Sequence, residues 1–366
     1  MARPTFPKTL REFRERFAAE RACLNYLWAS RWPEGFRCPR CGSRRAWPLA
    51  ERRVWECQGC GSQISPTAGT LLHRSHFPLR EWFWGAYLVA THTPGLSATQ
   101  LQRQMGCSYK TAWFLLQRLR RAMVNEGRSP LAGRIEADEV IVGGPVRGKS
   151  GRGVTKAENS TLVFGAVEVI AYQDRHGDHL EKAGRLRLAV AQRADAVSIR
   201  SFLTSNALPG SVINTDGWKG YSKTALAGYG HELHDPETHA LHIHRAFGNL
   251  KTWLNGTHHG VDPKYLQHYL DAFVFRFNRR NTPMAAFQTL LGLASRRNHV
   301  PLKRMVKPES TGEAYWTNTT PDLARFAGAD GTYAITVGGA ITIGPGTKSS
   351  LAGGLVFANS GYTLSA

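Results

Sequence analysis

The sequence lacks any run of about 18 apolar residues, and its first 17 residues lack the apolar core of a signal peptide. Cysteine is also scarce, with 6 in 366 residues, too few for a disulfide scaffold in a chain of this length. We therefore expect no membrane span and a location in the reducing cytoplasm. Acidic residues are also few: the chain has 27 Asp and Glu and 47 Lys and Arg, which gives a net charge of +20.

The positive charge is unevenly distributed. Residues 1–130 carry 21 Lys and Arg against 8 Asp and Glu, whereas residues 308–366 carry 2 against 4. A polyanion such as a nucleic acid is therefore expected to contact the first part of the chain and not the tail. The alternative is a basic enzyme from an organism that favours arginine. Hydrophobic residues make up 42% of the chain, which excludes a wholly disordered protein.

Four of the six cysteines form two C-x-x-C pairs, Cys38/Cys41 and Cys57/Cys60. Four thiolates at this spacing predict a tetrahedral structural Zn²⁺ site on a short hairpin, and they leave no open coordination position for catalysis. A redox C-x-x-C motif or free thiols are the alternatives. Arginines surround the pairs and favour a zinc ribbon that faces DNA: Arg37, Arg40, Arg44, Arg45, Arg52 and Arg53.

Residues 96–123 read as two helices joined by a turn at 105–108, which is the pattern of a helix-turn-helix. Tyr109, Lys110 and Thr111 open the second helix, where a recognition helix contacts base edges. Arg118, Arg120 and Arg121 lie near its end and are expected to contact phosphates. An ordinary helical hairpin with a solvated basic face is the alternative.

The middle of the chain has the element order of a ribonuclease H-like α/β domain. Three strand-like runs precede a helix, a fourth strand and two closing helices: 134–144, 160–172, 185–192, 194–207, 211–218, 242–255 and 263–280. The fold class we predict is therefore multidomain α+β. It combines a zinc ribbon and helix-turn-helix with this α/β domain and ends in a Gly-rich, β-prone tail.

Two carboxylates carry the predicted chemistry. Asp138 lies within a strand of branched residues, where an unpaired acid is costly. Period-two alternation puts Glu136 on the same face and Glu139 on the opposite one. Asp216 ends the strand at 211–218, although an Asp-Gly pair is also common in plain turns. Carboxylates from neighbouring strands that hold two Mg²⁺ ions are the arrangement for in-line phosphoryl transfer.

The chain resembles insertion-sequence transposases that join an N-terminal zinc ribbon to a DDE-type, ISXO2-like catalytic domain. The ribbon, IEADEVIVGG, NTDGWKGY and the segment at 244–281 carry the resemblance, which runs from about residue 10 to 305. It implies a DNA transposase, a polynucleotidyl transferase that binds the ends of its element and catalyses Mg²⁺-dependent strand cleavage and strand transfer. Asp138 and Asp216 match the family's first two magnesium ligands. Double-stranded DNA, a homodimer or larger assembly on DNA, and a nucleoid-associated location in a bacterial cytoplasm are implied as well.

The third metal-binding position is less clear from the sequence. Counting 33 residues from Asp216 reaches Asn249, in the helix where the family carries its third ligand. Asparagine offers a neutral carbonyl oxygen in place of a carboxylate. Alternative third acids are Glu232, Asp235 and Glu237. Arg245 lies one turn from Asn249 and is expected to bind DNA, and Lys251 is expected to bind the DNA backbone.

Four histidines and two aromatic residues each have two possible roles. His242, His244, His258 and His259 are predicted to lie near DNA phosphate, with a second metal site as the alternative. Trp218 and Tyr221 are expected either to stack on an unpaired base or to pack in the core.

The predicted organisation has five parts: an N-terminal helix at 1–30, the ribbon at 31–70, the helix-turn-helix region at 71–130, the catalytic domain at 131–305 and an atypical tail at 306–366. A DNA-binding regulator with an inactive ribonuclease H-like domain is the alternative function. A nuclease of the same fold without strand transfer is the third.

Overall fold

The computed structural model describes residues 4–49, 52–124, 127–143, 160–234, 242–296 and 298. The predicted tail at 306–366, together with Asp235 and Glu237, lies outside these residues. The chain separates into two units at residue 312, and everything below concerns the first.

The N-terminal segment forms two helices, α1 (Leu10–Arg16) and α2 (Glu20–Arg31), where the sequence predicts one. Thr9 caps α1, since its side-chain oxygen accepts a hydrogen bond from the backbone N–H of Glu12. Phe13 and Phe17, one turn apart, both contact the ring of Phe287.

The ribbon is a three-stranded antiparallel sheet of β1 (Ala46–Pro48), β2 (Trp55–Cys57) and β3 (Gln63–Ile64). Its own apolar core is very small and consists of Phe36, Cys38, Cys57 and Ile64. Trp28 of α2 stacks on Trp55, with ring centroids 4.3 Å apart, and attaches the ribbon to the helices.

The helical region consists of α3 (Leu79–Thr91), α4 (Ala98–Met105) and α5 (Tyr109–Ala122), so the helix-turn-helix elements form where predicted. Gly106 ends α4 with a φ of +62°, and Ser108 caps α5. A further helix, α9 (Pro283–Ala294), buries Phe287, Leu290 and Leu291 in this helical core. The sequence assigns those residues to the catalytic domain, whereas the structure packs them against the N-terminal helices.

The mixed sheet contains β4 (Arg134–Val142), β5 (Thr161–Gln173), β6 (His179–Ala191), β7 (Val212–Thr215) and β8 (Gly230–Leu233). The strand order is β6-β5-β4-β7-β8. The first three strands pair antiparallel, whereas β7 is parallel to both β4 and β8. Together with α6 (Ala196–Asn206), which precedes β7, this is the predicted ribonuclease H-like arrangement; β8 was not predicted.

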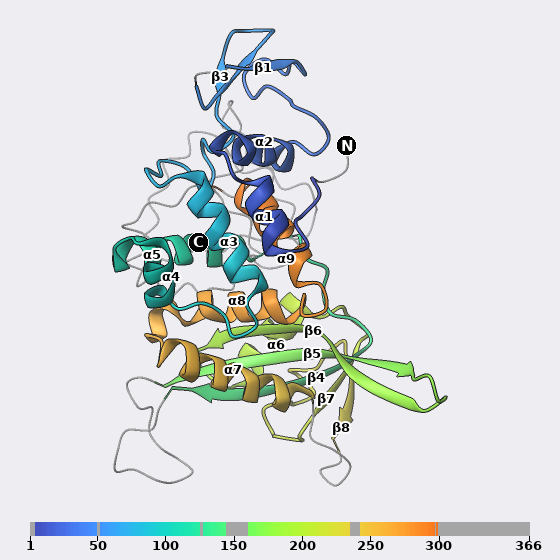
Figure 1. Cartoon of the computed structure of the whole chain (residues 1–366). Helices are drawn as coiled ribbons and strands as arrows, with labels where there is room; N and C mark the ends of the chain where they lie inside the picture. Colours follow the sequence, from blue (N-terminus) through green and yellow to red (C-terminus); the bar gives the residue numbers. More distant parts are fainter. Residues whose placement is uncertain are drawn as a thin grey trace, which may run out of the picture. The chain divides into compact units, whose positions relative to one another are not determined.

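Three helical elements follow the sheet: α7 (His242–His258), the 3-10 turn η1 (Pro263–Tyr265) and α8 (Leu266–Phe277). Helix α7 lies across the sheet (Figure 1) and contacts β4 and β5. Gly165 of β5 allows this close approach, because a Cβ there would lie 2.6 Å from the ring of Phe247. Gly165 pairs with Asp138, so α7 is held directly over that carboxylate.

None of the described helices is both long and apolar enough to cross a membrane.

Candidate active site and zinc ribbon

Asp138 and Asp216 lie on neighbouring parallel strands. The parallel register of β4 and β7 pairs Glu136 with Asn214. When this register is continued by two residues along each strand, Asp138 comes opposite Asp216. The Asp138 side chain is 14% exposed, whereas Asp216 follows the last residue of β7 and is exposed. The two carboxylates therefore share one face and one end of the sheet.

Helix α7 contacts that face through its first turn. The Nε2 atom of His244 lies 3.0 Å from Oδ2 of Asp138. Glu136, only 3% exposed, accepts a hydrogen bond of 2.9 Å from the backbone N–H of Ile243. A buried carboxylate at a helix N-terminus is stabilised by the free N–H groups and the helix dipole. The predicted shared face of Glu136 and Asp138 is confirmed, because both side chains contact the first described turn of α7.

The carboxylates influence one another. Burial raises the pKa of Asp138, and the nearby charge of Asp216 acts in the same direction, while His244 opposes both. Burial, with the charge of Asp138, also raises the pKa of Glu139 to about 7. Clustered carboxylates of this kind favour a bound divalent cation, which compensates their charge. Carboxylate oxygens are also the donors that Mg²⁺ prefers, so these residues fit the ion.

Glu139 points away from α7 and has a different partner. The Tyr221 hydroxyl donates a hydrogen bond of 3.1 Å to its Oε2 atom. Tyr221 is buried, whereas Trp218 remains 38% exposed. The Tyr221–Glu139 bond joins the loop that follows Asp216 to the strand that carries Asp138.

Asn249 lies elsewhere on α7. Five residues separate it from His244, which corresponds to a rotation of about 140° around the helix and a rise of about 7.5 Å. Its exposed side chain lines a cavity together with Trp253 and Arg276. Glu232 is exposed on β8 and lies 3.8 Å from Arg134. The structure thus brings His244, and not Asn249 or Glu232, to Asp138.

Sequence reasoning missed His244 as a member of this cluster. No spacing in the sequence links His244 to Asp138, and the seven residues between His244 and Lys251 indicate only that these two lie on nearly the same face of α7. Both side chains are exposed on α7. Arg245 is exposed as well, so the cationic residues predicted on this helix are accessible.

The helix-turn-helix residues divide into two groups. Tyr109 and Lys110 are exposed at the start of α5, and Thr111 is half-buried. The predicted phosphate contact of Arg118 is wrong, because its side chain is buried. Its guanidinium donates a hydrogen bond to the backbone carbonyl of His73 and covers the ring of Phe114.

The other two arginines of α5 are also withdrawn from solvent. Arg120 is buried, with its guanidinium 3.9 Å from the centre of the Tyr269 ring, so its phosphate contact is excluded too. Arg121 is half-buried. Among the described residues, the exposed cations of this motif are therefore Lys110 at the start of α5 and Arg103 on α4.

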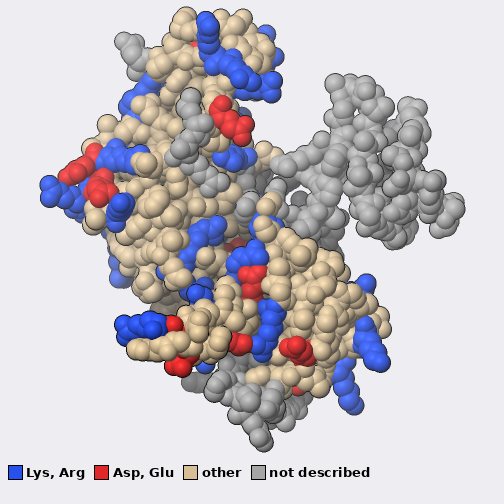
Figure 2. Space-filling view, turned by 90° about the vertical axis from the view of Figure 1, so that its right-hand side faces the viewer, with Lys and Arg blue, Asp and Glu red and all other residues tan. Residues whose placement is uncertain are grey.

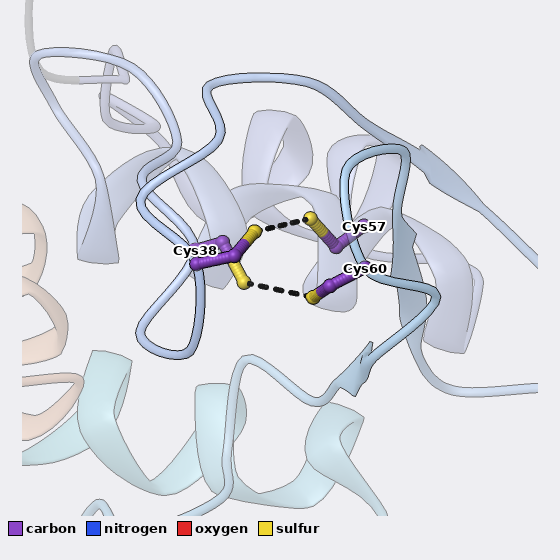
Figure 3. Close-up of side chains that lie close together, drawn as sticks. Cys38, Cys57 and Cys60 are labelled. Carbon is purple, nitrogen blue, oxygen red and sulfur yellow. Dashed lines mark hydrogen bonds between the residues drawn. The ribbon is translucent and has the colours of Figure 1, made fainter.

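The four paired cysteines meet at one point. Their Sγ atoms all lie within 4.8 Å of one another, at 3.8 Å for Cys38 and Cys60 and 3.5 Å for Cys41 and Cys57 (Figure 3). Zn–S bonds of about 2.3 Å in a tetrahedron separate the sulfur atoms by about 3.8 Å, so the site fits Zn²⁺. Hydrogen bonding with Ser62 lowers the pKa of Cys60 to about 6, which favours the thiolate that a metal requires.

The surface of the ribbon is basic. The six arginines noted around the cysteine pairs are all exposed, and Figure 2 shows Lys and Arg gathered at the end of the molecule that carries β1–β3. Among the described residues, the only one of the six with an ion pair is Arg53, which lies 3.2 Å from Glu20. This surface is therefore free to meet an anion.

The fold and the two sites define a ribonuclease H-like protein with an N-terminal structural zinc ribbon. Residues 130–278 match the ISXO2-like transposase domain, and residues 18–63 match the transposase zinc-ribbon domain. The resemblance to insertion-sequence transposases is thereby confirmed. Both domains imply DNA binding. No curated protein matches the chain.

Proposed function

We propose that this protein is a DNA transposase that binds the ends of its insertion sequence and catalyses Mg²⁺-dependent strand cleavage and strand transfer. The observation that carries the proposal is the placement of Asp138 and Asp216 on one face and at one end of neighbouring strands, with Nε2 of His244 3.0 Å from Asp138. Carboxylates on adjacent rigid strands hold metal ligands at fixed separation. The transposase domain match covers all three residues.

Asp138 and Asp216 are the proposed magnesium ligands. When bound there, Mg²⁺ activates a water or a 3′-hydroxyl as nucleophile and stabilises the leaving oxygen of an in-line displacement. His244 supplies the third contact through Nε2, either to the metal or to the Asp138 carboxylate. Glu136 positions His244 by holding the first turn of α7. Lys251, on the same face of α7, binds the DNA phosphate next to the site.

Recognition of DNA is assigned to two surfaces. The exposed arginines of the ribbon bind phosphates, and Tyr109, Lys110 and Thr111 at the start of α5 contact base edges. The described residues of each chain form one such acidic cluster, whereas an insertion sequence has two ends. We therefore propose that two or more copies act together on DNA.

The test of this function is strand cleavage and joining on a supercoiled plasmid that carries the element's own ends. Zinc-loaded protein with Mg²⁺ is expected to give nicked ends and joined products, and omission of Mg²⁺ is expected to give neither. Binding of the ends without cleavage would instead support the alternative function, a DNA-binding regulator with an inactive ribonuclease H-like domain. Cleavage that never leads to joined products would identify a nuclease.

Tyr221 provides a second prediction within the same site. Phenylalanine at this position removes the hydroxyl that ties the Asp216 loop to Glu139, so the metal ligands should be less well positioned. We expect the Mg²⁺ concentration for half-maximal cleavage to rise about 3- to 10-fold, with partial rescue at high Mg²⁺, because supporting hydrogen bonds at metal sites contribute about 10- to 100-fold in metal affinity or activity.

The matched control is Tyr229→Phe. It removes a hydroxyl that donates to the carbonyl of Ala207, at 3.2 Å, away from the acidic cluster. An equal rise in the Mg²⁺ requirement of both variants would show that loss of rigidity, and not the Glu139 contact, is responsible.

A further inference from the structure

A cavity of about 730 Å³ lies beside the active-site helix and is not used in the proposed chemistry. One wall is the end of α3 with the loop that follows it, and the other walls come from α7 and α8. This volume is within the range of small-molecule sites and accommodates a nucleotide, but it is far too small for a DNA duplex.

The lining combines positive charge with aromatic surface. Three arginines and three aromatic residues are among those that line it: Arg276, Arg279, Arg280, Trp253, Phe273 and Phe277. No carboxylate is found among the described residues that line it. Such a wall attracts an anionic group and offers flat apolar faces for a ring.

The arginines are held in place without being neutralised. Arg276 lies 5.5 Å from the centre of the Trp253 ring and donates to the carbonyl of Thr93. Arg279 and Arg280 likewise donate to backbone carbonyl groups. Within the described part of the chain, no carboxylate lies within 4.0 Å of any of these three guanidinium groups. Burial lowers the pKa of Arg276 to about 10, which reflects the cost of placing it there.

Two buried polar atoms in the wall also lack partners. Nδ1 of His92 and Nε1 of Trp253 are both inaccessible to solvent, and neither has a hydrogen-bond partner among the described residues. Unpartnered buried polar atoms are rare in folded proteins, and both of these belong to residues that line the cavity.

We propose that this cavity takes one unpaired nucleotide of the transposon end, with its base against the aromatic side chains and its phosphate toward the arginines. The inference rests on the proposed transposase function. Asn249 and Thr252 are residues of α7 in the lining, about 7.5 Å and about 12 Å along the helix axis from His244, so the nucleotide belongs to DNA next to the cleaved phosphate. The Asn249 side-chain amide is then available to a base edge.

The test uses DNA binding without Mg²⁺, so that it does not depend on catalysis. Duplexes of the element's end carry 5-iodouracil at one thymine position at a time, because this base crosslinks under light to an aromatic residue on which it stacks. In the full-length, zinc-loaded protein we expect crosslinking from one region near the cleavage site. The crosslinked residue is expected to be Trp253, Phe273 or Phe277, as identified by peptide mass spectrometry.

A cavity-filling variant and a matched control accompany it. Thr252→Trp places an indole in the cavity from an exposed position, and Ser205→Trp adds the same group to the exposed face of α6. Thr252→Trp is expected to abolish that crosslink and to weaken end binding at least about fivefold, since a stacked base contributes about 1–3 kcal/mol. Ser205→Trp is expected to do neither.

Three outcomes would overturn the proposal. Tight end binding with crosslinks only to Tyr109 or Trp218, or with none, would exclude this cavity and leave the transposase function intact. An unchanged crosslink in folded Thr252→Trp protein would also exclude it. Failure of the wild-type protein to bind its own ends would refute the proposed function together with the cavity.

Discussion

Alanine at Asp138, Asp216 or His244 is expected to reduce Mg²⁺-dependent strand cleavage by about 10³-fold or more. Metal ligands contribute several kcal/mol of transition-state stabilisation, and each 1.36 kcal/mol is a factor of ten in rate. The expected loss for His244 follows from its 3.0 Å contact with Asp138, and Asn249 makes no such contact in the described structure. Asn249→Ala is expected to weaken DNA affinity and to leave the Mg²⁺ requirement unchanged.

The measurement is the rate of end cleavage at saturating DNA, taken over a series of Mg²⁺ concentrations. His176→Ala is the matched histidine control, because His176 is exposed in the turn between β5 and β6, away from the acidic cluster. Melting curves establish that each variant is folded. A wild-type cleavage rate in His244→Ala, together with loss of cleavage in Asn249→Ala, would support Asn249 as the third metal ligand, as its spacing from Asp216 predicts.

The spacing of 33 residues from Asp216 predicts Asn249 as the third metal ligand, whereas in the structure His244 is the residue of α7 that contacts Asp138. Strand periodicity is two, so Asp138 and Glu136 were assigned to one face correctly from the sequence alone. Helix α7 itself was predicted from the sequence, at 242–255, and forms at His242–His258. Counting along the chain does not tell which face of that helix meets the sheet. Contacts between distant residues decide this, such as the hydrogen bond from the backbone N–H of Ile243 to Glu136, 107 positions away.

Arg118 illustrates a second limit of sequence reasoning. An arginine near the end of a helix in a basic chain is predicted to be a phosphate ligand. In the structure its guanidinium lies 4.3 Å from the centre of the Phe114 ring and donates to His73, so it stabilises the helical core. The pattern of α5 predicted the helix, but only the packing of distant segments decides which of its polar residues reach solvent. Zinc ligation, by contrast, was predictable, because four cysteines at fixed spacing specify the site locally.

Serine at Cys57 is expected to remove the bound zinc and unfold the ribbon, while the helical core and the mixed sheet stay folded. The ribbon has an apolar core of four side chains, of which Cys38 and Cys57 are themselves ligands. A core of this size does not offset the entropy of ordering its chain, and structural zinc contributes about 10–16 kcal/mol to the folding of comparable sites. The measurements are zinc content and amide hydrogen exchange across residues 36–64.

The loss of the ribbon should also be visible in DNA binding. Its six exposed arginines are held in position by the three strands and the metal, so unfolding disperses them. Each lost phosphate contact lowers the slope of log affinity against log salt by about 0.9. We therefore expect Cys57→Ser to bind end DNA with both a lower affinity and a shallower salt dependence than the wild type.

Cys107→Ser is the control, because Cys107 is half-buried beside the helical core and is not part of the cysteine cluster. It should retain one zinc per chain and the full salt slope. If Cys57→Ser lost zinc yet kept the wild-type slope, the ribbon arginines would not be contacting phosphate, and the electrostatic contacts would have to come from α5 and α7. If it kept zinc, three thiolates would suffice to hold the ion, and Cys57 would not be an essential ligand.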